Sequence, residues 1–372
     1  MGKQLARGAL NKALQMKAKK RIGYIDAMRG FTIMLVVLQH VVSICYEPEE
    51  LHTAYQSLQQ VRMPLFFFIS GFLFFKTDKV WNPAGVAGFL KKKVTVQILS
   101  PTIFMLLYFL YMGIGFKEGI LNKSKCGYWF TYTLFQFFII FITTQVIFRL
   151  LKLKDKYYDT AILLSGFLVC IISLESTHEY SFWNRNLTYF LGTGKWDLYI
   201  FFVIGTVVKK YFTDFEKLLK NKLTLLLCAL LLIVININRD YLINLIDYYV
   251  LQFACGTISI LFLFSIFRNL ENQLSQERRA GKIMQFIGCR TLDIYLIHFF
   301  LVYSEFGRSI IDIELSNNIL QIIYIIFITT ITVALALFIS SILRLNTTVG
   351  NFLFGSKKTM PAVQTMQQTA KG

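Results

Sequence analysis

The sequence predicts an all-α membrane protein with ten transmembrane helices and both termini in the cytoplasm. Its composition is the first reason, because 55% of the 372 residues are hydrophobic and only 16% are charged, against roughly 25% charged in a soluble protein. A soluble fold of this length has too little interior to bury so much apolar surface, and a chain this apolar is not disordered. Ten apolar stretches, and an alternation of basic charge between them, are the other two reasons.

The apolar stretches match membrane-spanning helices in length, since such a helix needs about 20 residues. The second, sixth and ninth stretches are short and need flanking residues to reach that length, and the tenth is long enough to tilt. No internal repeat is visible, and no soluble domain fits between the spans. The predicted spans are centred on residues 31–45, 63–75, 94–112, 130–148, 161–174, 198–208, 223–237, 248–267, 291–303 and 319–343.

The distribution of basic residues predicts the orientation. If the N-terminus is cytoplasmic, 30 of the 39 Lys and Arg residues lie in cytoplasmic segments and eight in outside loops, as the positive-inside rule requires. An odd number of spans would scramble this alternation. The same rule accounts for the net charge of +18. No basic groove interleaved with aromatic residues is visible, so we expect no nucleic-acid partner.

This map divides the chain into three segments. Residues 1–21 carry seven basic and no acidic residues and form a cytoplasmic arm, either flexible or lying on the membrane as a surface helix. Residues 22–345 form the transmembrane domain, and residues 346–372 form a polar, mobile cytoplasmic tail. The six cysteines have no CxxC spacing and are expected to be core thiols, with a pairing of Cys45 and Cys126 left open.

The first predicted span carries two ionisable residues, Arg29 and His40. Eleven residues advance an α-helix by about 16 Å and turn it about 20° beyond three full turns, so both side chains lie on one face. Taken singly, Arg29 is typical of a snorkelling topology residue and His40 of a helix-packing hydrogen bond. Ionisable groups inside spans usually face a cavity and have a function, so we interpret the pair as site residues.

Further candidates lie near other spans. Arg62 and Ser70 flank an aromatic run in the second span, where Ser70 and the following Gly allow close approach of a helix or a ligand. His298 is a second intramembrane histidine, which either acts in a site or packs against the first span. Trp129, at the mouth of the fourth span, is by default an interfacial aromatic. No zinc-protease, serine-hydrolase, P-loop or di-iron motif occurs, and no metal site is expected.

Together these residues resemble the acyltransferase-3 family, which comprises bacterial multipass enzymes, typically of ten spans, that acylate cell-surface carbohydrates. The most specific element is the Arg-x10-His spacing of Arg29 and His40. Next come the Pro-x-Phe-Phe-Phe-x-Ser-Gly-Phe run around Ser70 and the Asp-Ile-Tyr-Leu-Ile-His run that ends at His298. The resemblance extends over the whole membrane region, including Trp129 at the start of the fourth span.

One element departs from the family pattern. The family often has an Arg-x-x-Arg element on the cytoplasmic side between the second and third spans. Here Lys91, Lys92 and Lys93 keep the positive charge, but the second Arg is missing. If this element binds the phosphates of an acyl donor, the lysines do so as point charges without bidentate geometry. A basic inside loop is otherwise explained by topology alone.

The resemblance implies an O-acyltransferase in the bacterial inner membrane. It would move an acyl group, acetyl or another short chain, from a cytoplasmic acyl-CoA to a hydroxyl of a surface polysaccharide or lipid-linked glycan. His40 would be the base and Arg29 would orient the donor, because histidine titrates near neutral pH. The donor- or substrate-binding candidates are Arg62, Ser70, Lys91, Lys92, Lys93, Trp129 and His298. No tightly bound cofactor is expected, and direct transfer and a covalent intermediate both remain open.

Two other classes of protein stay as alternatives. A multipass transporter or exporter of a polysaccharide or small metabolite would commonly show inverted repeats and interrupted helices, and neither is visible in the sequence. A non-catalytic sensor or scaffold is the third possibility. Transfer of label from acetyl-CoA to a membrane glycan separates the first class from both.

Overall fold

All regular structure in the described part of the chain is helical, which confirms the all-α prediction. The predicted arm of residues 1–21 and residues 356–372 of the predicted tail lie outside that part. Cys45 and Cys126 are both free thiols. The computed structural model describes residues 22–45, 52–76, 83–152, 154–178, 183–311 and 318–355.

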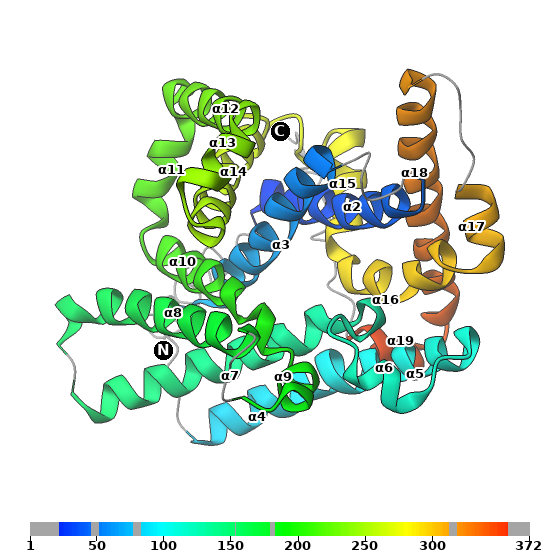
Figure 1. Cartoon of the computed structure of the whole chain (residues 1–372), viewed down its shortest axis with the longest axis horizontal. Helices are drawn as coiled ribbons and strands as arrows, with labels where there is room; N and C mark the ends of the chain where they lie inside the picture. Colours follow the sequence, from blue (N-terminus) through cyan, green and yellow to red (C-terminus); the bar gives the residue numbers. More distant parts are fainter. Residues whose placement is uncertain are drawn as a thin grey trace, which may run out of the picture.

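The helices pack into one bundle in which segments distant in sequence lie side by side (Figure 1). In chain order they are α2 Gly23–Cys45, α3 His52–Phe74, α4 Pro83–Val94, η1 Thr95–Leu99, α5 Ser100–Met112, α6 Phe116–Leu121, η2 Lys125–Gly127, α7 Trp129–Leu150, α8 Asp155–Thr177, α9 Arg185–Leu191, η3 Thr193–Leu198, α10 Tyr199–Lys210, α11 Phe212–Lys220, α12 Lys222–Ile237, α13 Arg239–Leu245, α14 Tyr248–Asn269, α15 Arg279–Cys289, α16 Thr291–Val302, α17 Glu305–Ile311, α18 Asn318–Leu343 and α19 Thr347–Phe354.

The length and apolar composition of these helices support a multipass membrane protein. Within the described residues six helices are long and apolar enough to cross a bilayer, and the number rises to nine if each of three bent helix pairs is one span. α3 adds a shorter apolar run, Gln60–Phe74. Each of the ten predicted segments falls in described helix or its immediate flank. The count of ten and the orientation of the termini stay predictions.

The three bent pairs are interruptions that the sequence analysis did not anticipate. α9 and η3–α10 meet at 46°, where Gly192 adopts a left-handed φ of +68°. α11 and α12 meet at 76°, and the Asn221 side chain accepts a hydrogen bond from the Leu223 N–H to begin the new helix. α15 and α16 meet at 78° around Arg290. The helices α9 and α15, which precede two of these bends, add length to the short sixth and ninth predicted spans.

α2 and α15 cross with their backbones in contact. A Cβ on Gly30 would overlap the carbonyl oxygen of Met284, and a Cβ on Gly288 would overlap the carbonyl oxygen of Asp26. Only glycine permits this approach from both sides, as is common where membrane helices associate. Because Arg29 directly precedes Gly30, the crossing also determines where the Arg29 side chain can point.

A second reciprocal glycine contact joins α3 to α10. A Cβ on Gly71 would overlap the Phe202 carbonyl oxygen, and one on Gly205 would overlap that of Phe68. Ser70 precedes Gly71, so the small Ser-Gly pair serves the close approach of a neighbouring helix. Aromatic rings of α3, α7, α10 and α14 fill the adjoining core.

The chain after α18 packs back onto the bundle as α19. Asn346 caps this helix by accepting hydrogen bonds from two backbone N–H groups. Ser100 donates a hydrogen bond to the Leu353 carbonyl, and the Phe354 side chain is buried. The part of the predicted polar tail that the structure describes therefore begins as an apolar helix attached to the membrane domain.

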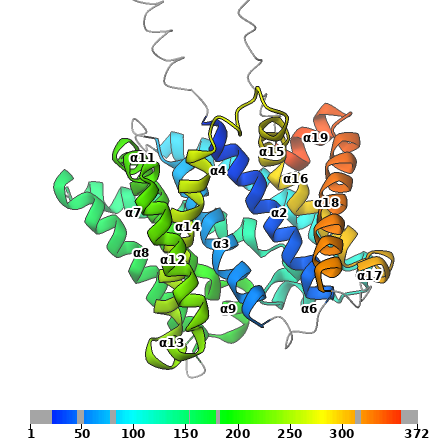
Figure 2. The ribbon, with the colours of Figure 1, turned by 90° about the horizontal axis from the view of Figure 1, so that it is seen from above.

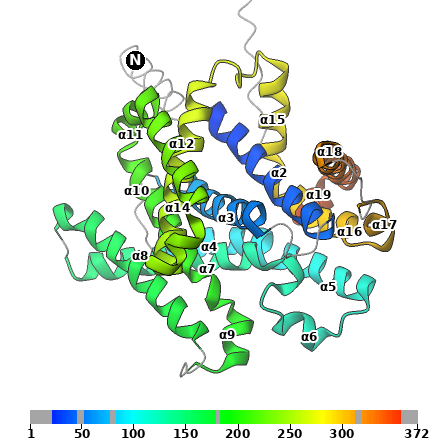
Figure 3. The same ribbon diagram turned by 45° about the horizontal axis from the view of Figure 1, so that its top comes forward.

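The bundle has two opposite ends, which Figure 2 shows clearly. α11, α15 and α19 lie at one end, here called the α19 face, and α6, α9, α13 and α17 lie at the other, the α13 face. α2 runs obliquely between them, and Figure 3 shows it crossing beside α3 and α16. Arg29 is therefore nearer the α19 face and His40 nearer the α13 face.

Thiol labelling tests the orientation of these two faces. In a chain whose native cysteines are replaced by serine, single cysteines at the exposed positions Lys123 and Tyr241 of the α13 face should react with an impermeant maleimide added to intact cells. Cysteines at the exposed positions Lys220 and Arg279 of the α19 face should react only after permeabilisation. The reverse pattern would invert the topology, and a mixed pattern would break the predicted ten-span map.

Substitution of the buried glycines tests the helix crossing. Gly71→Ala places a methyl group on the Phe202 backbone, so helices α3 and α10 must separate at a cost of about 1–3 kcal/mol. We expect a lower thermal unfolding midpoint in detergent. Gly88→Ala is the matched control, because nothing lies within 4 Å of a Cβ there. Equal midpoints for the two variants would contradict the contact.

Candidate active site

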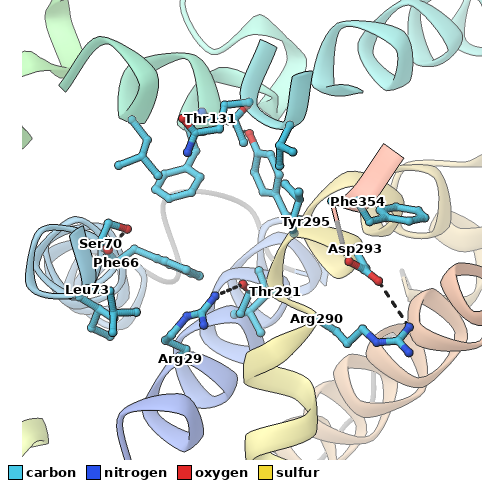
Figure 4. Close-up of a pocket in the computed structure, with 18 of the residues that line it drawn as sticks. Arg29, Phe66, Ser70, Leu73, Thr131, Arg290, Thr291, Asp293, Tyr295 and Phe354 are labelled. Carbon is cyan, nitrogen blue, oxygen red and sulfur yellow. Dashed lines mark hydrogen bonds and ion pairs between the residues drawn. The ribbon is translucent and has the colours of Figure 1, made fainter. Parts of the chain in front are cut away.

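A cavity of about 870 Å³ lies among α2, α3, α4, η1, α7, the α15–α16 bend and α19. Figure 4 shows its walls, with side chains from α2, α3, α7 and α16 pointing inward. Its size is in the range of small-molecule sites, about 300–1,000 Å³. It contains polar groups from segments that are far apart in sequence.

α2 lines the cavity with one helical face. Arg29, Ile33, Val36 and His40 all contribute to the wall and follow one another at three- or four-residue intervals. Arg29 and His40 thus share the face that their spacing predicts, about 16 Å apart along the helix axis. Apolar side chains separate them, so each meets a different chemical environment.

His40 is held by a tyrosine that the sequence analysis did not single out. Its Nδ1 lies 2.9 Å from the hydroxyl oxygen of Tyr303, and the Ser43 hydroxyl lies 3.4 Å from the same oxygen. The tautomer that leaves Nε2 basic carries its proton on Nδ1 and donates it to the Tyr303 oxygen. Tyr303 directly follows α16, and no motif in the sequence marks it.

His298 packs directly against His40, with the two ring centroids 5.3 Å apart. Its side chain is fully buried. Its Nδ1 lies 3.0 Å from the Ile294 carbonyl oxygen, which only accepts hydrogen bonds, so Nδ1 carries the proton. Nε2 has no hydrogen-bond partner within the described structure. The two histidines therefore form one cluster at the deep end of the cavity.

Arg29 occupies the other end of the same helix face. Its guanidinium donates to the Thr291 hydroxyl at 3.0 Å (Figure 4) and to the Asp26 carboxylate at 3.3 Å. Thr291 is the first residue of α16, so this bond links the first span to the α15–α16 bend. The side chain is largely buried and faces the cavity.

The end of the cavity nearest α19 is rich in cations. Lys93 lies between two aromatic rings, with its Nζ 4.7 Å from the ring centroid of Phe138. The only carboxylate among the described lining residues is Asp293, which is bound by arginine. A cavity with this excess of positive charge attracts polyanions. The cationic lining residues at this end are Arg29, Lys76, Lys92, Lys93, Arg290 and Arg344, whereas Arg62 lies nearer the two histidines.

Asp293 is a structural anion. Arg344 donates to both of its oxygens, at 2.8 and 2.9 Å, Ser340 adds a further hydrogen bond, and Arg290 lies 3.5 Å away (Figure 4). Arg344 also donates to the Gly355 carbonyl at 3.2 Å. This network ties α16, α18 and α19 together and leaves Asp293 fully occupied.

Most candidates from the sequence meet in this cavity, and two do not. Lys91 is exposed and does not line the cavity, unlike Lys92 and Lys93, and His298 packs against His40 without lining the wall. Trp129 is in the wall, with Lys195 Nζ 5.2 Å from its ring centroid. The predicted candidates that line the cavity are Arg29, His40, Arg62, Ser70, Lys92, Lys93 and Trp129.

Arg344 and Thr291 are two of the polar lining residues that sequence reasoning missed. Their partners are 51 and 262 positions away, and neither pairing leaves a trace in local spacing. In the described residues no cluster of three or more His, Cys, Asp or Glu side chains has the arrangement of a metal site.

One of the comparisons with known proteins gives a match. The model of the acyltransferase-3 family, described as an acyltransferase domain, matches residues 22–341. That range includes the α2 face, the α15–α16 bend and both histidines. No curated protein and no solved structure matches the chain.

Removal of the buried carboxylate tests the network around Asp293. Asp293→Asn leaves the Arg344 guanidinium buried without its counter-charge, which costs about 3–5 kcal/mol. We expect a large drop in the free energy of unfolding measured in mixed micelles. Arg344→Gln in the Asp293→Asn background should recover part of that loss, because the unpaired charge is then gone.

The matched control is Asp214→Asn. Asp214 pairs with Lys217 at 2.9 Å, but both side chains are 75% exposed, and such surface pairs contribute little. Comparable destabilisation at Asp214 and Asp293, or strict additivity in the Asp293–Arg344 double variant, would refute the structural role of the pair.

Proposed function

The chain belongs to the acyltransferase-3 family, and we propose that it is an integral membrane O-acyltransferase of the bacterial inner membrane. It transfers an acyl group, acetyl in the simplest case, from a cytoplasmic acyl-CoA to a hydroxyl of a surface polysaccharide or lipid-linked glycan. The observation that carries the proposal is one cavity with a cationic end and a histidine cluster about 16 Å along the same helix face.

The cationic end suits the donor. Coenzyme A is a phosphorylated nucleotide with a long flexible arm, so positive charge binds one end while the thioester reaches deeper. Lys92 and Lys93 supply point charges at the rim, and the exposed Lys91 adds to the attraction from solvent. Arg29 binds anionic or carbonyl groups along the arm of the donor, about 16 Å along α2 from the base, so that the thioester itself reaches His40.

His40 provides the base. Its Nε2 takes the proton of the acceptor hydroxyl while that oxygen attacks the thioester carbonyl carbon. The carbon–sulfur bond then breaks, the electron pair leaves with the CoA sulfur, and the proton on His40 is passed to that thiolate. The products are an O-acyl ester and free CoA, and His40 returns to its neutral form.

Tyr303 positions the base. A hydrogen bond from Nδ1–H to the tyrosine oxygen selects the tautomer with a basic Nε2 and holds the ring orientation. His298 also packs against the His40 ring. It restricts His40 without competing for the Tyr303 hydroxyl.

A transporter is the second candidate, because the described residues include three interrupted helices and such helices are common in transporters. The two functions differ in whether a covalent product forms. A transporter would move an unmodified substrate across liposomes and would not transfer label from acetyl-CoA.

The decisive experiment follows labelled acetyl from acetyl-CoA into membrane glycan with purified full-length protein. Wild type should transfer label, and His40→Ala should lower turnover by roughly 10²- to 10⁴-fold while the protein remains inserted. Arg29→Lys keeps the charge but loses the planar guanidinium. A large loss of turnover in this variant indicates a directed contact with the donor, whereas a residue that only sets topology would tolerate the substitution. Absence of transfer by folded wild-type protein would reject the function.

His298→Ala controls the assignment of the base. If His298 only packs, this variant keeps most of the turnover once its folding is verified by gel filtration. The base is His298 if the outcome is reversed, so that His298→Ala loses turnover by the factor expected for His40→Ala while His40→Ala stays active.

A further inference from the structure

A second cavity, of about 600 Å³, has no lining residue in common with the first. It is formed by the end of α8, by α9 and η3, and by the connection between α6 and α7. α9 and α6 lie at the α13 face in Figure 2, opposite the cationic rim of the main cavity. Its volume is in the range of small-molecule sites, about 300–1,000 Å³.

The walls of this cavity are held by internal hydrogen bonds. Ser173 donates to the Thr193 carbonyl and Thr193 donates to the Ser176 hydroxyl, both at 2.8 Å, which attaches η3 to α8. Lys125 is buried and donates to the carbonyls of Ile120 and Tyr189, which attaches the α6–α7 connection to α9. The cavity is therefore a defined part of the fold.

Its charge is positive. Lys123, Arg185 and Lys195 contribute to the lining from three different segments, and no Asp or Glu is among the described lining residues. Lys123 Nζ lies 5.1 Å from the ring centroid of Tyr189. Asp197 lies outside this lining and interacts electrostatically with Lys195. Lys123 and Arg185 have no carboxylate beside them in the described lining, so an anionic ligand would reduce the repulsion among the three cations.

Its remaining groups suit a sugar. Trp183 and Tyr189 line the cavity, and aromatic faces pack well against the apolar side of a pyranose ring. Thr188 also lines it and is only 5% exposed, yet its hydroxyl oxygen has no hydrogen-bond partner within the described structure. A buried hydroxyl without a partner is costly, and a ligand hydroxyl would satisfy it.

The second cavity adjoins the first through one pair of residues. Lys195 lines the second cavity, its Nζ lies 5.2 Å from the ring centroid of Trp129, and Trp129 lines the first. If a chain of sugar units binds at Lys195, only the Trp129 side chain lies between it and the main cavity. Two sites that share a wall in this way fit a polymer that enters from the α13 face.

We propose that the second cavity binds an anionic sugar unit, bearing a carboxylate or a phosphate, of the acceptor glycan. The proposal rests on the proposed acyltransferase function and names its acceptor class. Lys123, Arg185 and Lys195 neutralise the anion, and Thr188 hydrogen-bonds a ring hydroxyl. A neighbouring unit of the same chain then reaches past Trp129 to the acylation site.

Calorimetric titration of the purified full-length protein at low ionic strength tests this directly. The ligands are trigalacturonate, glucose 6-phosphate and the neutral maltotriose. Trigalacturonate or the sugar phosphate should bind at least about tenfold more tightly than maltotriose, and added salt should weaken the binding. Tighter binding of trigalacturonate identifies the anionic group as a carboxylate, and tighter binding of glucose 6-phosphate identifies it as a phosphate. Equal binding of all three ligands, or no binding of either anion, would overturn the proposal.

Two variants locate the binding in this cavity. The double variant Lys123→Gln and Arg185→Gln should weaken binding of the anionic ligand about tenfold or more, and Thr188→Val should weaken it severalfold without unfolding the chain, because Thr188 has no internal partner to lose. Lys220→Gln, an exposed cation at the α19 face, is the matched control and should leave binding unchanged. The binding would instead be assigned to a lipid site if phosphatidylglycerol displaced the sugar and if both variants bound the sugar as tightly as wild type. That result would refute the proposed site.

Failure of this site and failure of the proposed function give different results. Sugar binding is measured without acetyl-CoA, so it does not depend on turnover. Loss of sugar binding with retained label transfer to a neutral glycan would reject only the anionic acceptor. Retained sugar binding with no label transfer would reject only the acyltransferase.

Discussion

The close approach of helix backbones at glycine determines the rest of this structure. Without much hydrophobic driving force between helices inside a bilayer, their association depends on packing, and packing is best where no side chain separates two backbones. Gly30 with Gly288 joins α2 to α15, and Gly71 with Gly205 joins α3 to α10. Arg29 and Ser70 directly precede two of these glycines, so the same contacts that assemble the bundle also direct both side chains toward the cavity.

A second constraint is charge inside an apolar medium. Asp293 and Arg344 are both almost fully buried and satisfy each other with two hydrogen bonds. Such a pair adds little stability over an apolar one, but it is specific, because either partner alone would be an uncompensated buried charge. It therefore sets the register of α16 against α18, and through the Gly355 carbonyl it places α19 beside the cationic end of the cavity.

The resulting molecule presents different chemistry toward its two ends. The α19 face leads to cations suited to a phosphorylated donor, and the α13 face carries a separate basic and aromatic cavity. His40 and His298 pack together at the deep end of the main cavity, and Trp129, with Lys195 against its ring, lies between the two cavities. Under the proposed function, this arrangement lets donor and acceptor approach from opposite sides of the membrane and meet at one base, with no need for either substrate to cross completely.

The sequence by itself determined the helical membrane class, the family, and the shared face of Arg29 and His40, because hydropathy, charge alternation and helical periodicity are local properties of the chain. It also located Lys92, Lys93 and Trp129 near a site through motif order. The bends at Gly192, Asn221 and Arg290, the Tyr303 contact to His40, the Arg344 partner of Asp293 and the second cavity were decided only by the tertiary structure. Each of these depends on which helices become neighbours, and that choice is made by glycine contacts and buried charge pairs between residues far apart in sequence, which no local pattern encodes.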